Sequence, residues 1–331
     1  MARMDPELAS QIRVDVEKLA VAGGRAVGTP GHDNARRYLI ERLRGLKLRP
    51  YIGESFELPY CTNGNSFTNL IGLISGRSCR ASPLLIGAHY DTCGSTPGAD
   101  DNAAAVAIVL EVARRLRQRE LRRDLIVAIF DAEEPLYFLG SSMGSTHFYN
   151  CQRGGDIDCA FILDLVGHDV PLPGLENGLF ITGMESHKQL ADVVEQIPLS
   201  SAIRPIPTLN EYVGDMSDHH IFRINGIPYL FFSCGHWVHY HASTDTPDRL
   251  NYAKIEATAE LLAHMVQHTD AKDLGRSAAA FDSTPIELRM MNRALGPWLQ
   301  ARGMKLLSTR GKSARWTEPL RGRGVAWPIR P

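Results

Sequence analysis

Short apolar runs alternate with longer segments of helical periodicity along most of the chain, and this alternation constrains the fold more than any other feature. We expect the runs to be buried strands; they span residues 69–76, 82–91, 124–134, 159–169, 178–184 and 227–235. The clearest helical patterns span residues 33–46, 102–117, 186–197 and 251–267. Such alternation predicts an α/β fold with a mixed, mainly parallel central sheet and helices on both faces.

The pattern changes near the C-terminus, and we therefore expect two parts. Residues 1–272 contain no internal repeat or linker and are predicted to form one domain. Residues 273–331 are predicted to be an extension, with a helix over residues 283–302 and a tail of seven Lys or Arg against one Glu over residues 305–331. Because the tail lacks regularly interleaved aromatic residues, we interpret it as a surface extension rather than a nucleic-acid site.

Composition excludes several classes of partner. The formal net charge of the 331 residues is -1, so no overall field attracts the chain to nucleic acid or to an anionic membrane. The N-terminus lacks the apolar core of a signal peptide and resembles an amphipathic helix, and no run approaches the roughly 20 apolar residues of a membrane span. We expect a soluble, cytoplasmic protein with no membrane or nucleic-acid partner. The oligomeric state stays open.

The six cysteines show no CxxC spacing, and without a signal segment they are expected to be reduced thiols. Cys93 and Cys234 each lie close in sequence to a loop that carries candidate metal ligands. We interpret both as packing residues, or as residues behind the ligands, rather than as ligands themselves.

Metal-ligating residue types stand where the predicted strands end. They are His89, Asp101, Glu134, Asp164 and His241. In open α/β sheets, sites form at the carboxyl ends of the strands, so these side chains are expected to meet. Histidines and carboxylates without a thiolate suit Zn²⁺, Mn²⁺ or Co²⁺. Five ligands are too many for one tetrahedral catalytic zinc, but they suit two ions that share one bridging carboxylate.

Five segments carry a family resemblance: HYD (89–91), PGADDNAAA (97–105), DAEEP (131–135), FILDLVG (161–167) and YHASTDTPD (240–248). In order and spacing they resemble the M28 family of zinc aminopeptidases, with glutaminyl cyclases as a related branch. The resemblance begins near Gly24, in GGRAVGTPGHDNARRYL, and ends near His268. It does not cover the C-terminal extension, and it implies that residues 1–272 are a metallopeptidase domain of the zinc aminopeptidase fold.

The resemblance also implies a role for each candidate metal ligand. Asp101 would bridge the two ions, His89 and Asp164 would complete one of them, and Glu134 and His241 would complete the other. The expected cofactor is two Zn²⁺ per chain, with Mn²⁺ or Co²⁺ as substitutes.

Two further residues are predicted to be catalytic. Asp91 is expected to accept a hydrogen bond from His89 and so to select the tautomer of the imidazole. Glu133 is expected to be the general base, since adjacent carboxylates in an irregular turn can point in different directions. Asp100 has no ligand role in this interpretation and is expected to satisfy backbone donors at the start of the following helix.

We therefore expect a hydrolase that cleaves peptide or amide bonds, most simply an aminopeptidase acting on a peptide or an amino-acid amide. Glutaminyl cyclase is the alternative, although Tyr240 stands where that branch commonly has Trp before the last histidine. Asp218 either caps a helix or corresponds to a proton-relay aspartate of the cyclases. A non-catalytic binding scaffold is less favoured because all five ligands and the base are present.

Other candidates are weaker. The wall of the pocket for the first substrate residue is expected to include apolar residues between the ligand motifs, namely Tyr212, Met216, Phe232, Trp237 and Tyr240. Gly140–Gly144 matches the G-x-S-x-G pattern of serine hydrolases, but Ser142 does not stand directly after a predicted strand, as that nucleophile must.

Overall fold

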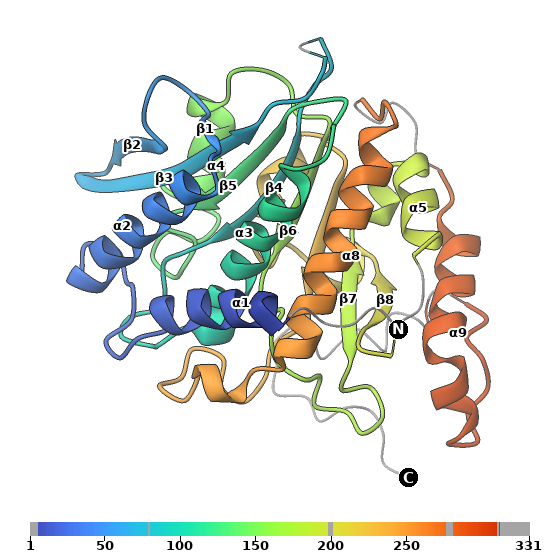
Figure 1. Cartoon of the computed structure of the whole chain (residues 1–331). Helices are drawn as coiled ribbons and strands as arrows, with labels where there is room; N and C mark the ends of the chain where they lie inside the picture. The colour runs from blue at the N-terminus through green and yellow to red at the C-terminus, as the bar shows by residue number, and fades with distance from the viewer. Residues whose placement is uncertain (1–5, 79, 198–200, 276–280, 310, 312–331) are drawn as a thin grey trace.

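The computed structural model describes residues 6–78, 80–197, 201–275, 281–309 and 311 (Figure 1). Cys79 and most of the basic tail lie outside the described residues. The five described cysteines, Cys61, Cys93, Cys151, Cys159 and Cys234, are free thiols.

The described residues form nine strands in one sheet. The strands are β1 (Arg49–Pro50), β2 (Glu57–Thr62), β3 (Asn65–Ile74), β4 (Leu84–His89), β5 (Leu125–Phe130), β6 (Cys159–Leu163), β7 (Gly178–Thr182), β8 (Arg204–Thr208) and β9 (Tyr229–Ser233). Their order is β1-β3-β5-β4-β6-β9-β7-β8, and β2 pairs with β3. Strands β5, β4, β6 and β9 are parallel, whereas β3 and β7 run antiparallel to their neighbours β5 and β9. The predicted mixed sheet is confirmed.

Three strands were not expected from the sequence. β1 has two residues, which is too short to show a period. β2 and β8 carry proline, and β8 has two, Pro205 and Pro207, which remove backbone donors. Because β8 closes one edge of the sheet, these missing donors cost no pairing on its outer side.

Helices cover both faces of the sheet (Figure 1). The nine α-helices of the described residues are α1 (Pro6–Leu19), α2 (Pro30–Gly45), α3 (Ala104–Leu116), α4 (Gly144–His147), α5 (Lys188–Glu195), α6 (Asn210–Val213), α7 (His219–Ile224), α8 (Tyr252–Asp270) and α9 (Thr284–Gln300). Alternate residues of a strand face opposite sides. Leu84 and Ile86 of β4 accordingly join the core under α1, α3 and α8, while Leu85 joins a second core with Phe148 and Phe222.

The start of α3 differs from the expected helix over residues 102–117. Residues Ala99–Ala103 form a single π-helical turn, η1, in which Asp101 and Asn102 have non-helical backbone angles and are joined by a cis peptide bond. The turn displaces Asp101 from the helix proper. The remaining short turns are η2 (Phe148–Gln152), η3 (Met184–Ser186) and η4 (Pro247–Arg249).

The helix expected over residues 283–302 is α9, which packs against β8 and α5. Its Glu287 accepts a hydrogen bond from the Tyr212 hydroxyl of α6, at 2.8 Å. The division of the chain at residues 272 and 273 stays a prediction. Among the residues with a described structure, no helix is long and apolar enough to cross a membrane.

Candidate metal centre

Two groups of side chains meet beyond the carboxyl ends of β4, β5, β6 and β9. The first group surrounds His89, the last residue of β4, which is fully buried. Its Nε2 lies 3.4 Å from Asp101 Oδ1, 3.5 Å from Asp164 Oδ1 and 3.7 Å from Glu133 Oε2. Asp164 follows β6 directly, and Glu133 stands three residues after β5.

The second group surrounds His241, in the loop after β9. Its Nε2 lies 2.9 Å from Glu134 Oε2 and 3.2 Å from Asp101 Oδ2. The two oxygens of Asp101 therefore face different histidines, Oδ1 toward His89 and Oδ2 toward His241. The structure thus brings all five candidate ligands together, with Asp101 between the two groups.

The donor atoms fit divalent cations. Two atoms that each bind a tetrahedral zinc at about 2.0–2.2 Å lie about 3.3–3.6 Å from one another. The distances from His89 to Asp101 and to Asp164 are in this range. In addition, several buried atoms of the cluster have no hydrogen-bond partner: His89 Nε2, Asp164 Oδ1, Glu134 Oε1 and His241 Nε2. Buried polar atoms rarely stay unpaired, so such a set indicates an ion site.

The pKa values of the cluster reflect crowded negative charge. Burial, and then the charge of Asp101, raises the pKa of Glu134 to about 8. Burial by itself would lower the pKa of His241, but Asp101 and Glu134 raise it to about 10. Burial raises the pKa of Glu133 well above its ordinary value. The raised pKa values favour the protonated forms of these groups, which reduce the negative charge of the cluster as a bound divalent ion would.

Asp91 holds the turn that carries both glutamates. Its Oδ1 accepts the backbone N–H of Glu133 at 3.0 Å, and its Oδ2 accepts that of Glu134 at 3.1 Å. Oδ1 also lies 3.3 Å from Nδ1 of His89, the atom expected to donate to it, but the two atoms do not form a hydrogen bond in this structure. The two backbone bonds were not expected, because nothing in the spacing shows that β4 and β5 are neighbours.

Asp245 holds the backbone at Asp101, as Asp91 holds the backbone of the two glutamates, and the sequence analysis did not identify it. Its carboxylate accepts the backbone N–H of Asp100 at 2.9 Å and of Asp101 at 3.1 Å. Burial, and then the charge of Asp100, raises the pKa of Asp245 to about 7. A signal was present, since Asp245 stands four residues after His241 in the quoted YHASTDTPD motif.

Asp100 satisfies backbone donors, but those of a different loop from the one expected. Its Oδ1 accepts the N–H groups of Gly167 and His168, and its Oδ2 lies 2.6 Å from His168 Nδ1. A Cβ added at Gly167 would lie 3.0 Å from Asp100 Oδ1 and 2.9 Å from the Ala104 side chain. Glycine is required there so that the chain after β6 can approach this carboxylate.

The backbone is held in the left-handed region at or beside two of the candidate ligands and the candidate base. Ala132 has φ 55° before Glu133, Leu165 has φ 55° after Asp164, and His241 itself has φ 52°. Non-glycine residues adopt such angles rarely, and they concentrate at functional sites.

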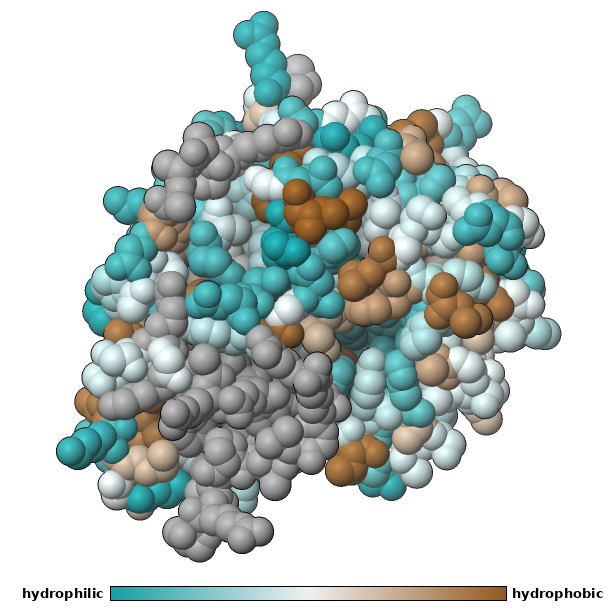
Figure 2. Space-filling view, turned by 180° about the vertical axis from the view of Figure 1, so that it is seen from behind, coloured by the Kyte–Doolittle hydropathy of each residue, from teal (hydrophilic) through white to brown (hydrophobic). Residues whose placement is uncertain are grey.

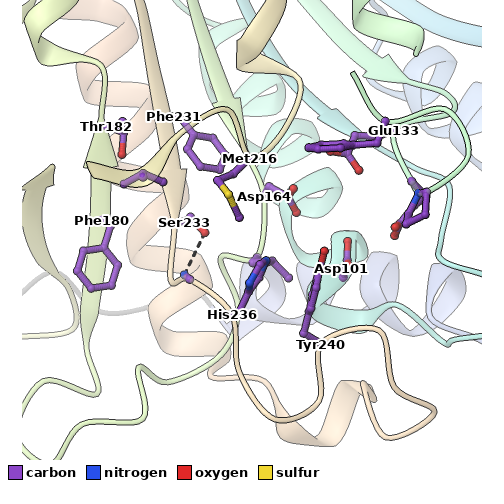
Figure 3. Close-up of a pocket in the computed structure, with 16 residues that line it drawn as sticks. Asp101, Glu133, Asp164, Phe180, Thr182, Met216, Phe231, Ser233, His236 and Tyr240 are labelled. Carbon is purple, nitrogen blue, oxygen red and sulfur yellow. Dashed lines mark hydrogen bonds between the residues drawn. The ribbon is translucent and has the colours of Figure 1, made fainter. Parts of the chain in front are cut away.

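A pocket that is open to solvent adjoins the cluster. Figure 3 shows Phe180 and Phe231 on one side of it and Asp101 and Glu133 on the other. The lining is mixed, with Asp101, Glu133, Glu134, Asp164, Thr182, Ser233 and His236 beside Pro135, Phe138, Leu165, Phe180, Val213, Met216, Phe231, Gly235 and Tyr240. The surface seen from behind is mainly hydrophilic with separate apolar patches (Figure 2).

The expected pocket wall was partly wrong. Met216 and Tyr240 line the pocket. Tyr212 instead bonds to α9, Trp237 stacks on His168 with ring centroids 4.5 Å apart, and Phe232 packs in the core beneath the helices. Along β9 it is the neighbouring Phe231 that reaches the pocket, because successive strand residues face opposite sides.

Two other residues singled out from the sequence, Asp218 and Ser142, belong to neither ligand group. Asp218 precedes α7 without capping it, is fully buried, and has no hydrogen-bonded carboxylate oxygen; burial raises its pKa to about 7. The hydroxyl of Ser142 accepts a hydrogen bond from Thr62 Oγ1 at 2.6 Å, which gives it a structural partner rather than a catalytic base.

Comparison with known proteins agrees with this geometry. The sequence model of Peptidase family M28 matches residues 69–266. The uncharacterized protein YfbL of Escherichia coli K12 is 30% identical over 203 residues, which are 52% of this chain and 62% of YfbL, so the chain spans less than two thirds of that relative.

Two solved structures show the same fold at low sequence identity. An aminopeptidase from Aneurinibacillus sp. strain AM-1 matches with a TM-score of 0.62 at 16% identity, over 83% of this chain and 96% of its own. Porphyromonas gingivalis glutaminyl cyclase matches with a TM-score of 0.63 at 21% identity, over 78% and 97% respectively.

Proposed function

Because the chain belongs to peptidase family M28, we propose that it is a zinc-dependent aminopeptidase that removes the first residue from peptides or amino-acid amides. The match over residues 69–266 confirms the family expected from the motifs. The observation that carries the proposal is the position of Asp101, with one carboxylate oxygen toward each histidine of the cluster.

Two Zn²⁺ ions are the proposed cofactor. His89, Asp164 and Asp101 would hold one ion, and Glu134, His241 and Asp101 the other. Two such ions, when bound, supply Lewis acidity for the scissile carbonyl and help to generate the nucleophile. The ligand set also admits Mn²⁺ or Co²⁺.

Glu133 is the proposed general base. Its carboxylate lines the pocket and lies 3.7 Å from His89 Nε2, at the edge of the ligand group. There it takes a proton from the attacking water and returns it to the leaving amine. Burial raises the pKa of Glu133 and so favours the protonated form that the base must adopt during the reaction.

Asp91 is a positioning residue in this mechanism. Through two backbone N–H groups it holds both Glu133 and Glu134, and through Oδ1 it faces His89. One carboxylate thus sets the direction of the base and of two proposed ligands.

The apolar wall of the pocket supports a preference for an apolar first residue. Phe138, Phe180, Val213, Met216 and Phe231 lie on it, and no Lys or Arg is among the pocket-lining residues in the described part of the chain. A charged first side chain would lose its hydration against this apolar wall, where no polar group of the wall would replace it.

Glutaminyl cyclase is the second candidate, and Asp218 is the observation that favours it. This carboxyl group is fully buried, has no hydrogen-bond partner, and lies in the SDH segment that resembles the proton-relay segment of that branch.

A cytoplasmic location also stays a prediction.

The test begins with metal removal. Chain treated with chelator and then reloaded is expected to bind two zinc ions and to regain hydrolysis of a leucine anilide. The substrate panel adds a lysine anilide, dipeptides, N-acyl amino acids and a glutaminyl peptide. Full activity with a single ion would contradict the dinuclear site, and closure of the glutaminyl peptide without any hydrolysis would establish the cyclase instead.

Two variants separate catalysis from metal binding. Glu133→Gln should keep its metal and lose about 10²- to 10⁴-fold in rate, since it cannot accept a proton. Glu134→Gln should instead bind metal more weakly and recover part of its activity in added zinc. Glu120→Gln, at a side chain 81% exposed to solvent, is the control. If Glu133→Gln loses metal and Glu134→Gln keeps it, the two roles are exchanged.

A further inference from the structure

One thiol lies beside the second ligand group. Cys93 stands four residues after the end of β4, and its Sγ, one carboxylate oxygen of Glu134 and one ring nitrogen of His241 all lie within 4.8 Å of one another. Its thiol is half-buried.

The backbone around Cys93 is held firmly. The Cys93 carbonyl accepts hydrogen bonds from Thr96 Oγ1 at 2.8 Å and from Thr96 N at 3.3 Å, which closes a tight turn. Thr92 Oγ1, one residue earlier, accepts the backbone N–H of Arg25 at 2.7 Å.

Arg25 holds the far end of the same loop, because its buried guanidinium donates to the carbonyls of Tyr90, Pro97 and Gly98. The loop is therefore tied at both ends and within its turn. The thiol is presented to Glu134 and His241 by a fixed backbone.

The two neighbours of the thiol both have unused donor atoms. Glu134 Oε1 and His241 Nε2 are buried and have no hydrogen-bond partner, and the Glu134 side chain is only 5% exposed. Sulfur, nitrogen and oxygen donors converge here, and a thiolate is a strong ligand for zinc.

The other described cysteines have different surroundings. Cys61 and Cys151 are exposed, and the Cys234 thiol points to the Gly178 carbonyl at 3.8 Å. Within the described residues, the groups of three or more metal-ligating side chains include Cys93 and no other cysteine.

We propose that Cys93 is a further ligand, as the thiolate, to the metal ion held by Glu134 and His241. This inference rests on the proposed metal centre. It departs from the expectation that Cys93 only packs behind the ligands. With Asp101, it gives this ion four protein donors, one more than a catalytic zinc ordinarily takes, so water or substrate would bind this ion as a fifth donor.

The thiolate also changes which ion this position prefers. Soft thiolate donors favour zinc and cadmium over manganese, which prefers oxygen. Cys93→Ser should therefore weaken cadmium binding by at least the roughly 10- to 100-fold lost when an outer-shell partner of a metal site is removed. Manganese binding should change much less.

The decisive experiment is a cobalt titration followed by absorption. Full-length wild type loaded with Co²⁺ should show a thiolate-to-cobalt charge-transfer band in the near ultraviolet, together with the visible bands of the cobalt ion. Cys93→Ser should lack the charge-transfer band and keep the visible bands, while the control Cys151→Ser should match wild type. A band that persists in Cys93→Ser, or is missing from wild type, overturns the proposal.

Thiol labelling of the wild-type chain gives a second measurement that does not depend on the folding of a variant. Cys93 should react with iodoacetamide in the metal-free chain and be protected by zinc, whereas Cys61 and Cys151 should react equally in both, as read by mass spectrometry. Equal labelling of Cys93 with and without zinc overturns the proposal.

The two levels of the inference fail in different ways. A chain that binds no cobalt at all refutes the proposed metal centre. A chain that binds two cobalt ions without the charge-transfer band refutes only the role of Cys93.

Discussion

Replacing Asp91 by asparagine tests whether one buried carboxylate holds the turn that carries Glu133 and Glu134. Asp91 is 1% exposed, and each of its oxygens accepts one backbone N–H of that turn. Burial alone would raise the pKa of Asp91, but the nearby His89 imidazole and the hydrogen bonds from the two backbone N–H groups hold it below its ordinary value. The group is therefore charged at neutral pH.

The cost of Asp91→Asn follows from counting acceptors. Asparagine has one acceptor oxygen, so its NH₂ group must face one of the two backbone N–H donors. A lost bond to a charged group costs about 1.5–3 kcal/mol, and weakening the other from charged to neutral costs about 1 kcal/mol more. We expect a loss of about 3 kcal/mol in the free energy of unfolding of the zinc-loaded chain. The metal-free chain should lose less, because removing one negative charge relieves repulsion among the neighbouring carboxylates.

The assay is urea unfolding at pH 7 with and without zinc, together with zinc affinity by competition with a chelator. Because Glu134 and His89 both depend on Asp91, zinc affinity should fall roughly 10- to 100-fold. Asp156→Asn, at a side chain 67% exposed, should change stability by less than about 0.5 kcal/mol. A zinc-loaded Asp91→Asn chain as stable as wild type, with unchanged zinc affinity, would refute the reasoning.

Three further outcomes are expected. Asp101→Ala should lose both zinc ions, whereas Asp100→Ala should keep most of its metal but lose stability, because it leaves the N–H groups of the loop after β6 unpaired. Metal analysis and urea unfolding distinguish the two variants. Greater metal loss from Asp100→Ala than from Asp101→Ala would contradict the bridging role. Burial lowers the pKa of His219 from 6.5 to about 3, so the unfolded chain binds the proton first and stability falls as the pH drops from 6.5 toward 3. His219→Phe should reduce the fall in urea midpoint between pH 7 and 5, whereas the exposed control His268→Gln should not. An unchanged fall in His219→Phe would refute the assignment. Met216→Lys should lower kcat/KM for a leucine anilide by about 10- to 200-fold, and an unchanged value would remove Met216 from the substrate wall.

The loops that carry the candidate ligands show how much of the site local sequence patterns predict. His89, Glu134 and Asp164 each stand at or just after an apolar run, and parallel strands with helical crossovers bring such ends to one edge. The convergence of these residues was therefore predictable, while their roles stay proposals. The strands at the edges of the sheet were not predictable in the same way, because β8 contains two prolines and β1 only two residues.

The contacts made by the residues that support the cluster were not predictable from the sequence, for a different reason. Asp245 meets Asp100 across 145 positions of sequence, and Arg25 meets Gly98 across 73. Their partners are backbone groups, which every residue possesses, so no residue type marks the contact in advance.

The sequence by itself determined the strand and helix alternation and the residue types at the strand ends, since both are local and repeat with a period set by backbone geometry. Only the tertiary structure decided that Asp101 turns one oxygen to His89 and the other to His241, and that Phe231 rather than Phe232 faces the pocket. Those outcomes depend on which strands become neighbours and which face of each is covered. Long-range packing sets the neighbours of each strand and the face that is covered, and the residue pattern of a single segment contains neither.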